Sequence, residues 1–204
     1  MIKEHISVSD PKFDELDKAI RESYPNCCIV QIQKVTMDKN IEENFLRHYE
    51  RFTKINDKTK IVQLYHGCSV ESVNKIIHNG FLISENVNGA FGIGTYFSNS
   101  SFMSQSYAYQ KLIDQGTISY IIVADVVISD VVLGSAGINS GNKEMLEKDR
   151  NWPSCYVNRK QKTSIFCIPY DSGAIPRYII SFHKETNLYN RHNGSPRVIN
   201  YFKA

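Results

Sequence analysis

The sequence lacks the features that mark membrane, disulfide-stabilised and zinc-binding proteins. Its longest apolar stretch, residues 120–124, is far shorter than the roughly 20 residues of a membrane helix. The 5 cysteines are an odd number and form no C-x-x-C pair, which argues against a disulfide framework and a zinc site. No apolar signal region follows Met1. We therefore expect an intracellular protein, cytoplasmic or nuclear, with no metal and no membrane contact.

An excess of charge of one sign is also lacking. The 24 basic and 21 acidic residues leave a formal net charge of +3. The densest basic stretch, residues 159–162, is short and is better explained as a solvated loop, so no DNA binding is expected. What is present is a composition of 42% hydrophobic and 22% charged residues, typical of a globular domain. A length of 204 residues suffices for one such domain and is short for two.

The periodicity of the apolar residues predicts an α+β domain. Helical spacing is found in four segments, at about residues 11–24, 39–52, 70–79 and 100–112. Segments rich in β-branched residues predict strands at residues 29–35, 61–65, 119–127, 165–168 and 178–182. The second half is dominated by strands that do not alternate regularly with helices, which favours α+β over a doubly wound sheet.

Two segments carry residues that a packed core does not need. His66 ends a predicted strand and precedes Gly67, so its ring nitrogens can face a ligand while the glycine lets that ligand approach the backbone. The alternative is a histidine hydrogen-bonded within the core. Gly92 and Gly94 lack the third glycine of a dinucleotide-binding fingerprint, so an ordinary tight turn explains them equally well.

A third segment lies on a predicted helix. Ser104 and Tyr107 are three residues apart, so they would share a helix face and offer one hydroxyl and one ring to the same ligand. Simple exposure on the helix surface is the alternative. In order and spacing, the three segments together resemble the catalytic domain of the poly(ADP-ribose) polymerase family. The residues that carry the resemblance are Tyr65-His66-Gly67, Phe91–Phe97, Ser104, Tyr107 and Ala174–Phe182, with Val30–Val35 and Leu46–Tyr49 upstream resembling the mono-ADP-ribosylating members.

The resemblance implies an ADP-ribosyltransferase fold, α+β, with two packed, mainly antiparallel sheets, flanking helices and a split NAD-binding β core. Residues 1–204 would form this single domain, residues 1–24 its N-terminal helix, and no helical regulatory domain is expected. NAD⁺ would be the co-substrate, with no metal. Target proteins, including the chain itself, would be the acceptors.

The resemblance also implies roles for individual residues. His66 would hydrogen-bond the adenosine ribose, while the backbone of Gly67 and the hydroxyl of Ser104 would bind the nicotinamide carboxamide. Tyr96 and Tyr107 would sandwich the nicotinamide ring. The loop Leu82–Ala90 would lie beside the adenosine and the pyrophosphate. The NAD-binding residues expected in this way are His66, Gly67, Cys68, Tyr96, Phe97, Ser104 and Tyr107.

Two positions depart from the family pattern. Polymerising members carry Glu at the start of the next-to-last strand, where this sequence has Ile165, so the expected triad is His66, Tyr96 and Ile165. Asp171 is six residues further on, roughly 20 Å along an extended strand, and cannot substitute. We therefore predict transfer of single ADP-ribose units, to Asp or Glu side chains whose carboxylate supplies the missing charge. Ile93 stands where the family often has Lys, a loss that would weaken a contact near the acceptor.

Three other functions compete with this interpretation. A catalytically inactive relative would bind NAD⁺, ADP-ribose or a partner protein without turnover, but such relatives typically lose the His or block the pocket. A toxin-type arginine ADP-ribosyltransferase would need Ser-Thr-Ser and Glu-x-Glu, and the sequence has neither. Transfer to a nucleic-acid end is compatible with the charge of +3, although no motif favours it.

Overall fold

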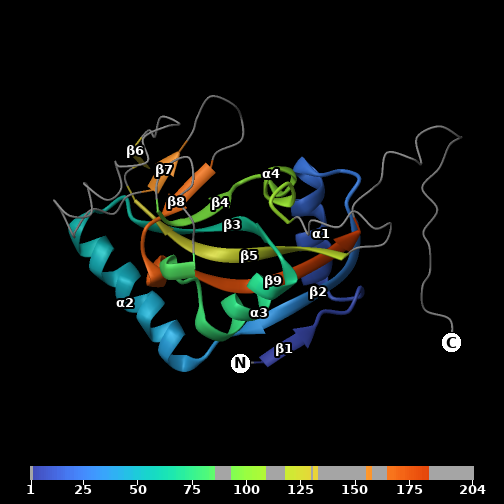
Figure 1. The fold of residues 1–204 in the computed structure, drawn as a ribbon, viewed down its shortest axis with the longest axis horizontal. Coiled ribbons are helices and arrows are strands. Elements are labelled where there is room, and N and C mark those ends of the chain that lie inside the picture. Colours follow the sequence, from blue (N-terminus) through green and yellow to red (C-terminus); the bar gives the residue numbers. More distant parts are fainter. Residues whose placement is uncertain are drawn as a thin grey trace, which may run out of the picture.

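The computed structural model describes residues 2–85, 93–108, 118–129, 131–132, 155–157 and 165–183, the two short segments among these by backbone alone. The strands are β1 Ile2–His5, β2 Cys28–Thr36, β3 Lys60–Cys68, β4 Thr95–Ser98, β5 Ile118–Ile128, β6 Val131–Val132, β7 Cys155–Val157, β8 Ile165–Ile168 and β9 Ala174–His183 (Figure 1). The helices are α1 Pro11–Ser23, α2 Lys39–Ile55, α3 Val70–Asn79 and α4 Ser101–Gln105, with 3₁₀ turns η1 Ile83–Glu85 and η2 Asp171–Gly173.

The described strands form one sheet in the order β1-β2-β9-β5-β3-β4-β8-β7-β6. Neighbouring strands are antiparallel except for β6 and β7, which are parallel. The α+β class and the mainly antiparallel pairing are thus confirmed. The expected division into two sheets is corrected to one continuous sheet, because Tyr65 of β3 pairs with Ser98 of β4. In the described residues this is the single pair between β3 and β4, and we call it the joint between the two strands. The sheet is therefore nearly split at this point.

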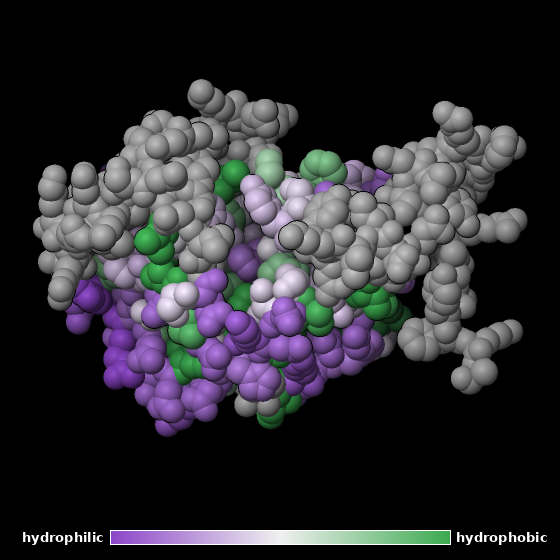
Figure 2. Space-filling model, viewed as in Figure 1, coloured by the Kyte–Doolittle hydropathy of each residue, from purple (hydrophilic) through white to green (hydrophobic). Residues whose placement is uncertain are grey.

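Helices cover both faces of the larger part of this sheet. Alternate residues of β5 enter two different cores, since Ile122 packs in the cluster that holds Phe45 of α2 and Ile77 of α3. Ile121 packs instead in the cluster that holds Ile20 of α1. In Figure 1, α1 and α4 lie together at one end of the molecule, while α2 runs along the opposite side. The side chains around α2 and α3 are mostly hydrophilic on the surface in Figure 2.

Side-chain caps explain why three predicted helices begin where they do. The carboxylate of Asp10 accepts a hydrogen bond from the backbone N–H of Lys12, and the carboxylate of Asp38 does the same for Asn40. The hydroxyl of Ser69 caps α3 in the same way, and Gly80 ends that helix with a φ of 75°, a conformation that favours glycine. Helices α1, α2 and α3 thus confirm the helices predicted at about residues 11–24, 39–52 and 70–79.

Three predicted boundaries are wrong. The N-terminal segment begins with strand β1, which pairs with β2, before helix α1 starts. Strand β3 continues to Cys68 because the long strand β5 supplies partners along it, so His66 and Gly67 lie within the strand and not after its end. Helix α4 ends at Gln105 and not at residue 112, since the next N–H groups bond three residues back in a tighter turn. Residues 109–112 lie outside the described residues.

Candidate active site

The side chain of His66 connects β3 to β4 next to the joint between these strands. His66 follows Tyr65, the last residue of β3 that pairs with β4, and its Nδ1 lies 2.8 Å from the carbonyl oxygen of Tyr96. The ring also packs against Phe81 and Phe97, with ring centroids 5.4 and 5.6 Å away. His66 is therefore held in one orientation at the point where the two strands separate.

The surroundings of His66 determine its protonation. Burial lowers the pKa of the imidazole, and the hydrogen bond to the Tyr96 carbonyl raises the pKa by a smaller amount, so the ring is neutral at pH 7. A carbonyl oxygen can only accept, so Nδ1 carries the proton and donates it. Nε2 is then left as a hydrogen-bond acceptor. Such a nitrogen suits a ligand hydroxyl.

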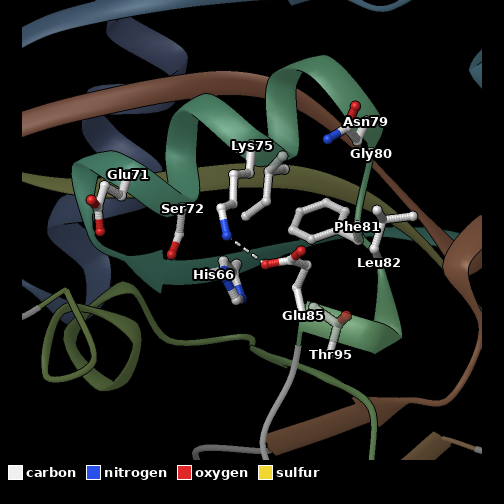
Figure 3. A pocket seen from close by; sticks show the side chains of 11 residues that line it. His66, Glu71, Ser72, Lys75, Asn79, Gly80, Phe81, Leu82, Glu85 and Thr95 are labelled. Carbon is white, nitrogen blue, oxygen red and sulfur yellow. Dashed lines mark hydrogen bonds and ion pairs between the residues drawn. The ribbon is translucent and has the colours of Figure 1, made fainter.

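His66 forms one wall of a cavity of about 210 Å³ between β3, α3 and η1. Figure 3 shows polar side chains of α3 on one side of this cavity and Glu85 of η1 on the other. The Nζ of Lys75 lies 2.6 Å from Oε2 of Glu85, so an ion pair joins the two sides. The lining residues are His66, Glu71, Ser72, Lys75, Ile76, Asn79, Gly80, Phe81, Leu82, Glu85 and Thr95.

Most of the polar lining was not predicted from the sequence. The apolar residues of α3 are spaced along one side of the helix, and the other side carries Glu71, Ser72 and Lys75. Such a polar side is typical of a helix surface that faces solvent. Of the predicted loop Leu82–Ala90, Leu82 and Glu85 do line the cavity, and residues 86–90 lie outside the described residues.

The cavity-lining turn η1 is anchored from a distant part of the chain. The Oδ1 atom of Asp171 in η2 accepts a hydrogen bond of 2.6 Å from the backbone N–H of Ile83. Asp171 is thus engaged in positioning η1.

The opposite face of β3 carries a second part of the predicted site. Successive strand residues point to opposite faces, so Gly67 lies against α4 while His66 lies in the cavity. A Cβ at Gly67 would lie 2.7 Å from the carbonyl carbon of Ser104 and 3.1 Å from the N of Ala108. The buried hydroxyl of Ser104 donates a hydrogen bond of 2.9 Å to the carbonyl of Tyr65. The structure thus brings Gly67 and Ser104 together, and the expected binding of nicotinamide by these two residues stays a prediction.

The family model of the poly(ADP-ribose) polymerase catalytic domain matches residues 12–191. The chain belongs to this family. Among curated proteins, no sequence matches the chain. Domains of the poly(ADP-ribose) polymerase family are ADP-ribosyltransferases that use NAD⁺ as substrate, so the cavity at His66 and the Gly67–Ser104 contact are the candidate NAD⁺ site.

The other residues expected to bind NAD⁺ are placed differently. The side chains of Cys68 and Phe97 are buried in the core, and burial raises the pKa of the Cys68 thiol to about 12, so its sulfur stays protonated. Tyr107 lies beyond the end of α4 and is 65% exposed, so it is available for stacking on a ligand. Gly92 lies outside the described residues, and Ile93 is 37% exposed.

Ile165 begins β8, which precedes the last described strand, β9. It pairs with Ser98, while Cys167 pairs with Tyr96. Paired residues share a face and alternate residues of a strand share a face, so Ile165 and Tyr96 lie on the same face of the sheet. Ile165 thus places an apolar side chain on the face of the sheet that Tyr96 shares.

The part of the chain that the structure describes contains no group of three or more His, Cys, Asp or Glu side chains placed to hold a metal ion. In the same residues, no helix has the length and apolar character needed to cross a membrane.

Proposed function

We propose that this protein is an NAD⁺-dependent mono-ADP-ribosyltransferase that modifies Asp or Glu side chains of target proteins and of itself. The observation that carries the proposal is the fixed tautomer of His66, whose Nδ1–H is held by the Tyr96 carbonyl. The neutral Nε2 is left as an acceptor on a residue that lines the cavity. A ribose hydroxyl can donate to it, which would orient the adenosine half of NAD⁺.

The proposed reaction exchanges one glycosidic bond for another. The bond between the nicotinamide nitrogen and C1′ of its ribose breaks, and both bonding electrons leave with nicotinamide, which departs neutral. A carboxylate oxygen of the acceptor then bonds to the same C1′ through an oxocarbenium-like transition state. Because the acceptor is already ionised, no protein group has to remove a proton, and the chain's contribution is to position the dinucleotide and exclude water.

Ile165 supports the restriction to single units. Extending a chain requires a ribose hydroxyl to act as nucleophile, and a hydroxyl needs a carboxylate or another base to activate it. The side chain of Ile165 has no group that can do this. A protein carboxylate is already ionised and needs no such activation. An acidic acceptor is therefore compatible with an apolar residue at this position.

The test uses NAD⁺ labelled in its adenosine half, with the purified protein as its own acceptor. We expect label transfer and nicotinamide release by the wild type, and loss of both in His66→Ala and Tyr96→Ala. Ile165→Ala and the matched control His78→Ala, which removes an exposed histidine of α3, should retain transfer. Circular dichroism confirms that each variant is folded.

Mass spectrometry of the modified protein then decides between the finer alternatives. Single ADP-ribose additions on Asp or Glu support the proposal, whereas long chains would contradict the restriction to single units. Binding of NAD⁺ without label transfer or nicotinamide release would show that the protein is an inactive binding module instead.

A further inference from the structure

The Lys75–Glu85 ion pair crosses the cavity that His66 lines. Figure 3 shows the amine of Lys75 reaching from α3 and the carboxylate of Glu85 reaching from η1, and His66 lines the same cavity. A ligand that bonds to Nε2 of His66 must therefore share the cavity with this pair, either by contacting it or by separating it.

The pair is not placed to stabilise the fold. The Lys75 and Glu85 side chains are 60% and 52% exposed, and exposed ion pairs contribute little to the free energy of unfolding. Turn η1 has its own anchor, since Ile83 N–H is held by Asp171. Glu85 can therefore release Lys75 by a side-chain rotation while the backbone of η1 stays in position.

The charges of the cavity show what Lys75 could bind. Among the described lining residues, Lys75 is the one Lys or Arg, and Glu71 and Glu85 are the two carboxylates. The hydrogen bond with Glu85 raises the pKa of Lys75, so its amine is charged at neutral pH. A cation beside a site for a ribose hydroxyl is the arrangement expected for a nucleotide phosphate.

We propose that Lys75 binds a phosphate oxygen of the NAD⁺ pyrophosphate, and that Glu85 occupies Lys75 until that phosphate displaces it. This inference rests on the proposed function, because it takes the NAD⁺ site to include the cavity at His66. Lys75 keeps an anionic partner before and after binding, so the exchange leaves no unpaired ammonium group. The carboxylate of Glu85 turns to solvent, to which it is already half exposed.

In this exchange Lys75 selects for ligands that carry phosphate, and Glu85 competes with the phosphate for Lys75. An uncharged ligand such as adenosine has no group that can replace the carboxylate, and it gains nothing from Lys75. A ligand that carries the pyrophosphate gains the contact with Lys75 but must compete with Glu85 for it. Removing Lys75 should therefore weaken only phosphate-bearing ligands, and removing the charge of Glu85 should strengthen them.

The experiment measures binding of ADP-ribose and of adenosine by isothermal titration calorimetry to the full chain. In Lys75→Met we expect the Kd for ADP-ribose to rise about tenfold, the size of one charge-assisted hydrogen bond, with the Kd for adenosine unchanged. In Glu85→Gln the Kd for ADP-ribose should fall several-fold. In the double variant this gain should vanish, because Glu85 acts only through Lys75.

The matched control is Lys12→Met, which breaks an ion pair of the same length, 2.6 Å to Glu15, on α1. It should bind both ligands as the wild type does. Unchanged ADP-ribose binding in Lys75→Met, or an equal loss of adenosine and ADP-ribose, would overturn the role of Lys75. A wild type that binds neither ADP-ribose nor NAD⁺ would instead overturn the proposed function, so the two failures are distinguishable.

Discussion

The Nδ1 atom of His66 lies 2.8 Å from the carbonyl oxygen of Tyr96, across the joint at which β3 and β4 stop pairing. The side chain of His66 thus connects β3 to β4 beside the point where backbone pairing between the two strands ends. The same contact fixes which nitrogen of the ring carries the proton. Two properties of the candidate site, the orientation of His66 and the acceptor character of its Nε2, follow from this one hydrogen bond.

The first prediction concerns the pH dependence of activity. Burial lowers the pKa of His66 below the ordinary value of 6.5, so the neutral, accepting form predominates at pH 7 and above. Acidification adds a proton to Nε2 and removes the acceptor. We expect kcat/KM for nicotinamide release to be level above pH 7 and to fall only at pH values below 6.5. A rate that increases on acidification would contradict a neutral His66.

The second prediction concerns His48 and the pH dependence of stability. Burial lowers the pKa of His48 to about 4 from 6.5, the nearby charge of Arg51 adding to the effect. The unfolded chain therefore takes up the proton first as the pH falls, and the folded state loses stability between pH 6.5 and about 4. The loss attributable to His48 is up to about 3 kcal/mol, from about 1.4 kcal/mol per unit of pKa.

Urea unfolding at pH 7, 5.5 and 4.5 measures this loss. His48→Gln should reduce the dependence on pH in this window, although it also removes ring contacts with Phe52 and Tyr170, 4.5 and 5.1 Å between centroids. The exposed His78 serves as control, and His78→Gln should keep the wild-type dependence. An unchanged slope in His48→Gln would assign the acid sensitivity to other groups.

The sequence predicted best those elements whose signals are local. The caps Asp10, Asp38 and Ser69 lie within two or three residues of the N–H groups that they satisfy, and the three helices start where these residues predict. Helix α4 carries a cap of the same kind, Ser100, but its length was overestimated. Its end is packed closely against Gly67 of β3, a contact that no local pattern reveals.

The candidate site was predicted in part for the same reason. His66, Gly67 and Ser104 were predicted as site residues through the family resemblance, which depends on spacing along the chain. Lys75 and Glu85 are ten residues apart on different elements, and their meeting depends on how η1 folds back over α3. The anchor from Asp171 to Ile83 spans 88 residues, so the shape of the cavity is a tertiary property.

The third prediction tests the close approach at Gly67. In Gly67→Ala the new methyl group would overlap the backbone of Ser104, so α4 or β3 must move. We expect a loss of about 1–3 kcal/mol in the free energy of unfolding, as for other overpacked cores, together with loss of NAD⁺ binding. Ser104→Ala should not rescue Gly67→Ala, because the clash is with backbone atoms. A stable Gly67→Ala that binds NAD⁺ would contradict this packing.

Gly173→Ala serves as a comparison, because its new methyl group would clash with a side chain and not with the backbone. Its Cβ would lie 2.5 Å from Cγ2 of Ile168, so Ile168→Ala in the same chain, which removes this atom, gives the new methyl group more room. We expect partial recovery of stability in the double variant relative to the sum of the two single variants. Urea unfolding of the four proteins measures this coupling.

The last prediction concerns Arg177 of β9, which links three elements. Its Nε donates to Asp125 of β5 at 2.7 Å and its Nη1 to Glu42 of α2 at 2.6 Å. The three side chains are 21–28% exposed, so they are partly shielded from solvent. Arg177→Met would leave two carboxylates without their shared cation, and we expect a loss of about 2 kcal/mol, within the range for hydrogen bonds to charged groups.

Glu42→Gln removes one of the two bonds and leaves Arg177 paired with Asp125, so its cost should be smaller than that of Arg177→Met. Arg21→Met is the matched control, since it breaks a 2.8 Å pair with Asp17 on one exposed helix face. That change should cost less than about 1 kcal/mol, as for surface ion pairs. If Arg177→Met cost no more than Arg21→Met in urea unfolding, the link from β9 to β5 and α2 would be an ordinary surface contact. A larger cost is expected because Arg177 neutralises two carboxylates on different elements, which solvent reaches only in part.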